Sequence, residues 1–266
     1  MRPIIIGAGR GKRLECITDD QPKSYAPIGG KKILDWIFEA FSGAGLDTPV
    51  FIGGYLIDVL KKDYPELTFC HNSDWERNNI LASLMYAEDF MDEGFVCSYS
   101  DILFRDTVVK RALEHEGDIV LCVDTHWHER YVDRTMHPAD DAEKVTVSGE
   151  RITRIHREIP TEEAAGEYIG VAKFSAHGAE LFRRAYHKVQ DTFAGKAWRE
   201  ANVFENAYFI LLIQDMIENG AVVHFVTTAG DYMEIDTVED YILANKRWVK
   251  KFDGAQITDG PLYDCN

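Results

Sequence analysis

Short apolar runs bounded by turn residues alternate with amphipathic stretches through the first half of the chain. Apolar runs of four to eight residues are typical of buried strands, and longer amphipathic stretches are typical of helices. The predicted strands are Pro3–Ile6, Val50–Gly53, Leu67–His71, Gly94–Ser98 and Asp118–Val123. The predicted helices between them are Lys32–Ala44, Tyr55–Asp63, Asn79–Phe90 and Arg105–Glu116. This alternation predicts an α/β fold with a mixed, mostly parallel sheet and helices on both faces.

The second half of the chain has a different pattern. Lys144–Val147 and Arg151–Ile155, joined by Ser148-Gly149-Glu150, predict a β-hairpin. Further elements are predicted as strands at Tyr168–Phe174, Ala221–Thr227 and Tyr232–Ile235, and as helices at His177–Asp191, Val203–Asn219 and Val238–Phe252. Since neither a repeat nor a low-complexity linker interrupts the pattern, we expect a single domain over residues 1–266. Residues 124–200 would form a small irregular lobe that contains the hairpin.

Composition narrows the possible partners and the location of the protein. The chain is 45% hydrophobic and 28% charged, as in ordinary globular proteins, and its net charge is −16. A surface this acidic repels nucleic acids and anionic membranes, so we expect neither as a partner. The N-terminus reads as a first strand and not as a signal peptide. The widely spaced cysteines contain no CxxC pair, which predicts buried thiols in a reducing cytoplasm, and they are Cys16, Cys70, Cys97, Cys122 and Cys265.

The first predicted strand ends in a glycine-rich loop, Gly7-Ala8-Gly9-Arg10-Gly11, with basic residues around it. Small residues after a strand allow backbone N–H groups to approach phosphate oxygens. A P-loop is excluded because Arg13 stands where serine or threonine is required. A dinucleotide-binding loop is excluded because no helix follows at once and the second strand ends in Gly53-Gly54 without an acid. A plain tight turn remains the alternative.

Two aspartates follow predicted strands in the second and last parts of the chain. Asp101 comes directly after the strand near residues 94–98, and Asp236 lies between a short strand and the last helix. In doubly wound sheets ligands gather at the carboxyl ends of the strands, where both side chains would lie. Carboxylates suit Mg²⁺, which uses one or two of them together with phosphate oxygens. Glu234, two positions before Asp236, is a secondary candidate for this site. The alternative is that each aspartate caps the helix that follows it.

The loop residues, together with Pro22-Lys23, resemble the N-terminal motif of nucleotidyltransferases related to sugar-phosphate and phosphocholine transferases. This chain departs from the motif at Gly7, where alanine is usual. The resemblance implies a Rossmann-like, GT-A-like nucleotidyltransferase fold. It also implies that Arg13 and Lys23 neutralise the triphosphate and the transition state, and that Asp101 and Asp236 together bind Mg²⁺. The implied nucleotide-binding residues in these segments are Gly7, Ala8, Gly9, Gly11 and Ser100.

A second stretch narrows the resemblance. Asn78-Asn79 with Ser83 one turn later looks like the Asn-Asn-x-x-Ser region of phosphocholine and phosphonate cytidylyltransferases. The wider pattern of the resemblance includes Gly166-Glu167-Tyr168-Ile169-Gly170, Ala207-Tyr208 and Glu234-Ile235-Asp236-Thr237. This resemblance implies CTP as the nucleotide and places Asn79 and Ser83 in its site. The implied acceptor is a small phosphorylated or phosphonylated alcohol or amine, such as phosphocholine or 2-aminoethylphosphonate. Helix capping is the alternative role for the two asparagines.

The expected acceptor has a cationic head, which acids and aromatic faces would bind. The segment from Asp124 to Arg134 is dense in such residues and follows a strand. We expect its arginines, Arg130 and Arg134, to hold the acceptor phosphate. Its two histidines, His126 and His128, lack a third close ligand and are expected to face solvent or phosphate. The predicted acceptor-binding residues are Arg130, Tyr131, Glu167 and Tyr168.

These observations predict a Mg²⁺-dependent cytidylyltransferase that releases pyrophosphate. One alternative is a sugar-1-phosphate nucleotidyltransferase that uses UTP, dTTP or GTP. Another is a catalytically silent nucleotide-binding relative, against which the presence of Arg13, Lys23, Asp101 and Asp236 argues. The acceptor, the base and the oligomeric state stay open. A homodimer is possible because the apolar helix near Phe204–Ile217 suits either the core or an interface.

Overall fold

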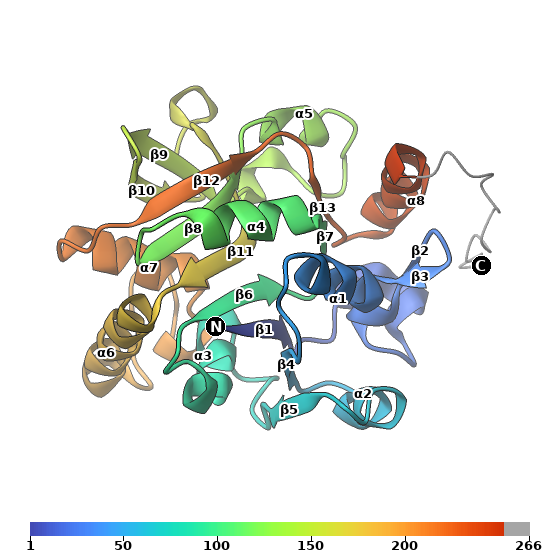
Figure 1. Ribbon diagram of the computed structural model, residues 1–266, viewed down its shortest axis with the longest axis horizontal. Coiled ribbons are helices and arrows are strands. Elements are labelled where there is room, and N and C mark those ends of the chain that lie inside the picture. Colours follow the sequence, from blue (N-terminus) through green and yellow to red (C-terminus); the bar gives the residue numbers. More distant parts are fainter. Residues whose placement is uncertain (253–266) are drawn as a thin grey trace.

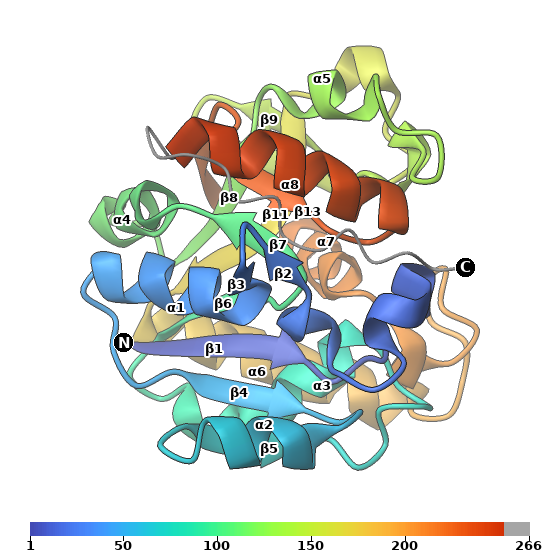
Figure 2. The same ribbon diagram turned by 90° about the vertical axis from the view of Figure 1, so that its right-hand side faces the viewer.

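The computed structural model describes residues 1–252, apart from the side chains of residues 15, 16 and 249–252. A nine-stranded mixed sheet has the order β5-β4-β1-β6-β11-β8-β12-β10-β9. Four strands at one side are parallel, with β1 and β4 side by side in Figure 2. Their bounds are β1 (Arg2–Gly7), β4 (Val50–Gly53), β5 (Thr68–His71) and β6 (Phe95–Tyr99). Because parallel strands end at the same edge, their following loops meet there.

In the other half of the sheet, parallel and antiparallel strands are mixed. Strand β11 (Gly166–Phe174) runs antiparallel to both β6 and β8 (Ile119–Asp124), and β12 (His224–Thr228) runs parallel to β8. The predicted hairpin is present as β9 (Lys144–Ser148) and β10 (Arg151–His156). The predicted mixed α/β fold is thus confirmed, with more antiparallel pairing than the alternation of elements alone suggests.

Helices cover both faces of the sheet (Figure 1). Alternate β1 residues point to opposite faces, so Ile4 and Ile6 pack in one apolar core and Ile5 packs in the other. The helices on the Ile4 face are α3 (Ile80–Leu84), α6 (Ala176–Phe193) and α7 (Phe209–Glu218). Those on the Ile5 face are α1 (Ile33–Gly43), α2 (Ile57–Asp63), α4 (Asp106–Glu114) and α8 (Val238–Phe252).

Two predicted helices are shorter than expected. The Asn79–Phe90 helix is α-helical only to Leu84 and continues as a 3-10 segment in which Ala87 has non-helical angles. The Val203–Asn219 helix begins at Phe209, since Tyr208 is extended and residues 204–206 form a separate turn. The apolar side chains of α7 lie in the core, so this helix offers no apolar face to a second copy.

Two short pairs of strands, which the sequence pattern does not reveal, complete the edge of the sheet at which the loops meet. Strand β7 (Ile102–Phe104) pairs antiparallel with β13 (Tyr232–Glu234), so that Glu234 lies opposite Ile102. The Ile235 amide then donates to the Asp101 carbonyl at 2.9 Å. The antiparallel pair β2 (Pro27–Ile28) and β3 (Lys31–Lys32) leads into α1. The β7–β13 pairing brings Asp101 beside Asp236, although 135 positions separate them in the sequence.

The predicted irregular lobe is smaller than residues 124–200. Helix α5 (Trp127–Tyr131) and the segment that follows it pack around a small apolar cluster of Trp127, Tyr131 and Ala142. The lobe ends where β11 begins, because α6 packs against the sheet. Among residues 1–252, the helices include none that is long and apolar enough to cross a bilayer. Cys97 and Cys122 are buried free thiols, as predicted, and Cys70 is half-buried; the Cys16 side chain and Cys265 lie outside the described part.

Candidate active site

Two adjoining cavities open where the carboxyl ends of β1 and β6 meet the lobe. The first has a volume of about 410 Å³ and the second about 280 Å³. Arg13, Tyr99 and Asp236 line both of them. A site with two joined compartments suits a reaction between two substrates, and the shared residues lie where such substrates would meet.

The glycine-rich loop forms one wall of the first cavity. A Cβ atom at Gly7 would lie 2.5 Å from Phe51 Cζ and 2.8 Å from Ser100 Oγ, so only glycine fits there. Gly11 has φ +69°, and a Cβ atom there would lie 2.7 Å from Lys23 Cδ. The loop therefore needs glycine at both positions to pack against the β6 end and the Lys23 side chain.

All the residues predicted for the nucleotide, for catalysis and for the metal line the first cavity. They are Gly7, Ala8, Gly9, Gly11, Arg13, Lys23, Asn79, Ser83, Ser100, Asp101 and Asp236. They come from the loops after β1 and β6, the start of α3 and the segment after β13. The structure thus brings together in one wall residues that the sequence places in four separate segments.

Lys23 lies between the two predicted metal ligands. Its Nζ donates to Asp101 Oδ2 at 2.7 Å and to Asp236 Oδ1, and its side chain is 11% exposed. Burial lowers the pKa of Lys23, but the two carboxylates raise it further, so the pKa lies above its ordinary value. Arg13 Nη2 donates to Asp236 Oδ2 at 2.6 Å. Burial raises the pKa of Asp236, yet Lys23 and Arg13 outweigh it and hold this pKa at about 2.

The surroundings of the two aspartates fit a hard cation better than helix caps. Helix α4 begins at Asp106, and the Asp101 side chain does not cap it. Helix α8 is capped by Thr237, whose Oγ1 accepts from the Asp240 amide at 3.2 Å, and the Asp240 carboxylate accepts in turn from the Asp236 and Thr237 amides at 3.1 and 2.9 Å. Asp101 Oδ1 is buried at the cavity wall without a hydrogen-bond partner among the described residues. An unsatisfied carboxylate oxygen beside a second carboxylate matches the oxygen ligands that Mg²⁺ prefers.

The asparagine-rich segment packs around the start of α3. The Asn79 side chain accepts from the Ile80 amide at 2.7 Å, so it caps α3 as well as lining the cavity. The sequence analysis missed Asn72, a fully buried residue whose Nδ2 donates to Asn78 Oδ1 and to Ser83 Oγ, both at 2.8 Å. This network fixes Ser83 at the cavity wall. The helix-capping alternative is correct for Asn79.

The second cavity is lined by acids, tyrosines and two arginines. Its walls consist of Arg13, Tyr99, His137, Asp141, Glu143, Arg157, Glu167, Tyr168, Ile169, Gly170, Tyr208, Tyr232, Glu234 and Asp236. Of the four predicted acceptor residues, Glu167 and Tyr168 are in this wall. A bulge in β11 at Gly170, which has φ +77°, lets the strand pass close to the Tyr99 ring.

The other two predicted acceptor residues, Arg130 and Tyr131, lie behind this wall. Arg130 pairs with the buried carboxylates of Asp124 and Glu167, and its distance to Glu167 Oε2 is 2.8 Å. Tyr131 donates to Glu167 Oε1 at 2.6 Å. Because α5 turns these side chains toward buried acids, they hold Glu167 in place and do not face the cavity. The sequence-based interpretation of Arg130 as a phosphate ligand is corrected accordingly.

The remaining polar residues of the segment after β8 also differ from expectation. Arg134 does not face the cavity: its Nε pairs with the buried Asp240 Oδ1 at 2.9 Å, and its Nη2 donates to the Glu234 carbonyl at 3.1 Å. His126 and His128 are exposed, as the sequence analysis expected of a solvent-facing pair. The charge of Arg134 is thus used to neutralise Asp240 and not to meet a substrate.

Sequence reasoning missed most of the polar residues on the far side of the second cavity. Burial raises the pKa of Glu143 to about 7, although Arg157, at 3.3 Å from its Oε1, opposes this shift. The Arg157 guanidinium also lies 4.0 Å above the Tyr208 ring centroid. Glu143 and Arg157 flank the predicted hairpin, where no periodic pattern marks them. Only Tyr208 belonged to a quoted motif, Ala207-Tyr208.

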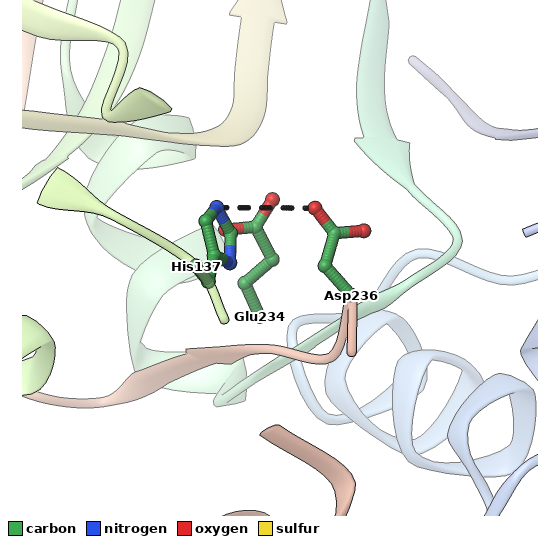
Figure 3. Close-up of side chains that lie close together, drawn as sticks. All are labelled: His137, Glu234 and Asp236. Carbon is green, nitrogen blue, oxygen red and sulfur yellow. Dashed lines mark ion pairs between the residues drawn. The ribbon is translucent and has the colours of Figure 1, made fainter. Parts of the chain in front are cut away.

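A histidine, His137, lies close to the acidic residues Glu234 and Asp236 at the boundary of the two cavities. His137 Nε2 lies 3.7 Å from Glu234 Oε2 and 4.0 Å from Asp236 Oδ2, and the three side chains point toward one another (Figure 3). Its other nitrogen, Nδ1, lies 3.4 Å from Asp240 Oδ2. Burial and the neighbouring Asp236 hold the pKa of Glu234 well above its ordinary value. Glu234 was a secondary candidate from the sequence, whereas His137 was missed.

The MobA-like NTP transferase domain family matches residues 3–192, which include the glycine loop and Asp101 but not Asp236. A CTP:phosphoglutamine cytidylyltransferase of Campylobacter jejuni is 29% identical over 256 residues, covering 90% of this chain and 97% of the relative. A choline-phosphate cytidylyltransferase of Haemophilus influenzae is 29% identical over 129 residues, covering 47% of this chain and 55% of the relative.

Solved structures show the same fold. A CTP:phosphocholine cytidylyltransferase from Streptococcus pneumoniae superimposes with a TM-score of 0.70 at 21% identity, covering 92% of this chain and 97% of its own. The inositol-1-phosphate CTP transferase from T. maritima gives a TM-score of 0.68 at 22% identity, covering 92% and 95%. These matches confirm the predicted nucleotidyltransferase fold.

Proposed function

The chain belongs to the MobA-like NTP transferase family and is a nucleotidyltransferase, and we propose that it transfers CMP from CTP to a small phosphorylated or phosphonylated acceptor. One observation carries this proposal. The glycine loop, Lys23, Asp101 and Asp236 converge on a cavity that adjoins a second, charged cavity and shares Arg13, Tyr99 and Asp236 with it. In addition, the C. jejuni relative that matches almost end to end is named a cytidylyltransferase.

In the proposed reaction an oxygen of the acceptor phosphate attacks the α-phosphorus of CTP. A new P–O bond forms, the bond from the α-phosphorus to the bridging oxygen breaks, and pyrophosphate leaves with the electron pair. No covalent enzyme intermediate is needed because the attacking group is already an anion. Lys23 and Arg13 neutralise charge on the phosphoryl oxygens, and such preorganised cations contribute strongly to phosphoryl transfer.

Mg²⁺ is the proposed cofactor. Asp101 and Asp236 would hold it, and when bound it would neutralise charge on the triphosphate oxygens. Lys23 pairs with both carboxylates in the structure, so its ammonium group would compete with a cation for them. A cytoplasmic location accords with this substrate and with the free, buried thiols of Cys97 and Cys122.

The second cavity favours an acceptor with a charged head over a neutral sugar. Glu143 and Glu167 would meet an ammonium group, and the tyrosines add aromatic faces. Arg157 adds a cation on the same wall, which suits a carboxylate on the acceptor. An acceptor built on an amino acid, such as the phosphoglutamine in the name of the C. jejuni relative, carries both groups. Phosphocholine and 2-aminoethylphosphonate carry only the cation.

Pyrophosphate release tests the proposal. The purified protein with Mg²⁺ is incubated with each of the four NTPs crossed with phosphoglutamine, phosphocholine, phosphoethanolamine, 2-aminoethylphosphonate and glucose-1-phosphate. We expect release with CTP and an acceptor that has an amino head. Release only with a sugar phosphate and UTP, dTTP or GTP would support the sugar-1-phosphate alternative, and no release with any pair would support a silent relative.

A further inference from the structure

We propose that Arg157 and Glu143 select the acceptor by its head group: Arg157 binds a carboxylate and Glu143 an ammonium group, so that a phosphorylated amino acid is preferred to a phosphorylated amine. Glu143 immediately precedes β9 and Arg157 immediately follows β10, and both line the second cavity. The inference rests on the proposed function, because it takes this cavity as the acceptor site. It adds the residues that determine which acceptor is used.

The ion pair between Arg157 and Glu143 is loose. Arg157 Nη2 donates to Glu143 Oε1 at 3.3 Å, and the Tyr99 hydroxyl donates to Glu143 Oε2 at 3.3 Å. Hydrogen bonds between guanidinium and carboxylate groups are usually about 2.7–2.9 Å long. The neighbouring pair of Arg130 and Glu167 has such a distance, 2.8 Å. Arg157 and Glu143 are therefore close enough to neutralise each other in the free enzyme, but each can form a shorter bond with a substrate.

Arg157 has donors available for an anion. Its side chain is 34% exposed, and its Nε has no hydrogen-bond partner among the residues that the structure describes. The guanidinium lies 4.0 Å from the Tyr208 ring centroid, and packing against a ring leaves its N–H edge available to a carboxylate. Arg13, the other arginine of this cavity, also lines the first cavity and pairs with Asp236 at 2.6 Å. Arg13 is thus placed for the acceptor phosphate, and Arg157 for a second anionic group.

Glu143 is the carboxylate best placed for an ammonium group on this wall. Both oxygens of Glu167 already have close partners, since Oε1 accepts from Tyr131 at 2.6 Å and Oε2 from Arg130 at 2.8 Å. Glu143 has only its two longer bonds and is nearly buried. Burial raises the pKa of Glu143 to about 7, and a bound ammonium group would stabilise its charged form.

The balance of charge favours an acceptor that carries both groups. When an amino acid head binds, its carboxylate pairs with Arg157 and its ammonium group with Glu143, so no charge on this wall is left alone. An amine that takes Glu143 leaves Arg157 without a carboxylate and places two cations side by side. Leaving one member of a shielded ion pair without its partner is costly. The wall therefore discriminates by the carboxylate of the acceptor.

Matched acceptors test this inference. Phosphoserine and phosphoethanolamine differ only in a carboxylate, as do phosphoglutamine and its decarboxylated analogue. For each we measure kcat/KM from the nucleotide adduct formed with CTP and Mg²⁺, and Kd by isothermal titration calorimetry without nucleotide. In wild type we expect the carboxylated member of at least one pair to be preferred about tenfold or more, because a site built to bind a polar group rejects the analogue that lacks it.

The variant Arg157→Gln should bring this preference close to one, chiefly by weakening the carboxylated acceptor. The control Arg154→Gln removes a half-exposed arginine of β10 and should keep the wild-type preference. Circular dichroism checks that both variants fold. If Arg157→Gln does not fold, Glu143→Gln provides the second test with each amino acid acceptor and its hydroxy acid analogue. Glu143→Gln should lose the wild-type preference for the amino acid, and an unchanged preference would contradict the inference.

Three results would overturn the inference: equal values for the two members of both pairs in wild type, an unchanged preference in Arg157→Gln, or failure of both amino acids to bind or react. A preference in Kd without transfer of CMP would contradict the proposed reaction and support this inference. Transfer of CMP without any preference would support the reaction alone. The two failures are therefore distinguishable.

Discussion

At the scale of single residues, the central feature is a buried ammonium group between two carboxylates. Lys23 contacts both Asp101 and Asp236, and its side chain is only 11% exposed. A buried charge is tolerated when it is paired in this way, and removing one partner leaves the others unneutralised. In our account Lys23 neutralises the aspartates in the free enzyme and the phosphates during the reaction.

Replacing this lysine should separate the two roles. In Lys23→Met we expect kcat to fall on the order of 10²- to 10³-fold, because a preorganised cation is lost from the transition state. We also expect Mg²⁺ to raise the melting temperature of Lys23→Met more than that of wild type, since no ammonium group competes for the carboxylates. The measurements are pyrophosphate release and thermal unfolding with and without Mg²⁺.

The matched control is Lys62→Met, which removes an exposed lysine from α2. It should leave both kcat and the Mg²⁺ response unchanged. Turnover of Lys23→Met near that of this control would show that Lys23 has no part in the chemistry.

The raised pKa of Glu143 predicts that the stability of the protein depends on pH. Burial raises its folded-state pKa to about 7, above the ordinary value of 4.5. Between these values the folded state binds the proton more often than the unfolded state, so stability from this group is lost as the pH rises through 7. From pH 5 to pH 8 its contribution to the free energy of unfolding should fall by about 2 kcal/mol. Urea unfolding at both pH values should show a smaller decrease in Glu143→Gln than in wild type; equal decreases would contradict the assignment.

Residues of the site differ in how well the sequence predicts them. Gly7 to Arg13, with Lys23, form a nearly contiguous motif, and Asp101 directly follows an apolar strand. Local sequence patterns are therefore sufficient to predict these residues. His137, Glu143 and Arg157 lie in irregular segments and at strand ends, and only tertiary folding brings them to one wall. The surroundings of Arg130 were equally invisible, because sequence does not show that α5 turns it toward Asp124 and Glu167.

At the scale of elements, the start of α3 shows how a cap also builds the site. Asn79 caps this five-residue helix and lines the first cavity. Asn79→Ala should lower the free energy of unfolding by about 1 kcal/mol, as expected for a lost cap. Asn79→Ser keeps a capping oxygen and should retain most of that stability. We expect both variants to raise the KM for CTP, because both remove the amide from the cavity. An unchanged KM for CTP in Asn79→Ser would show that Asn79 only caps the helix and does not contribute to nucleotide binding.

The buried Arg134–Asp240 pair joins the lobe to α8. Its side chains are 2% and 0% exposed, so Arg134→Met leaves an unpaired buried carboxylate. We expect a loss of about 3–5 kcal/mol in the free energy of unfolding, measured by urea denaturation. The same substitution at Arg247, whose pair with Asp133 is about half exposed, should cost no more than about 1 kcal/mol. Similar losses in the two variants would contradict a structural role specific to Arg134.

Periodicity predicts elements better than it predicts their interruptions. The strands and helices of the first half are within two residues of their observed bounds, apart from the helix at residues 79–90. The break at Tyr208 is hidden because apolar residues continue on both sides of it. The strand predicted at Tyr232–Ile235 is present as β13, but the three-residue strand β7 is too short to give a distinct pattern and was missed, although its pairing with β13 positions Asp101 beside Asp236.

At the scale of the whole molecule, one edge of the mixed sheet and the lobe above it define a two-compartment site. Alternating strands and helices predicted the parallel half, whereas the antiparallel placement of β11 between β6 and β8 could not be read from its apolar residues. This strand carries Glu167 and Tyr168 into the second cavity. Although the net charge is −16, the basic residues Arg13 and Lys23 lie where two anionic substrates would meet.

Mass spectrometry of the reaction product tests the central claim most directly. The protein is incubated with CTP, Mg²⁺ and either phosphoglutamine or phosphocholine, with Lys23→Met alongside. A parallel set contains glucose-1-phosphate and each of the other NTPs. We predict a product whose mass equals the acceptor plus CMP less water, formed in equal amount with pyrophosphate by wild type and almost absent with Lys23→Met. A CMP adduct that forms equally in Lys23→Met, or a nucleotide adduct found only with glucose-1-phosphate and another NTP, would contradict the account.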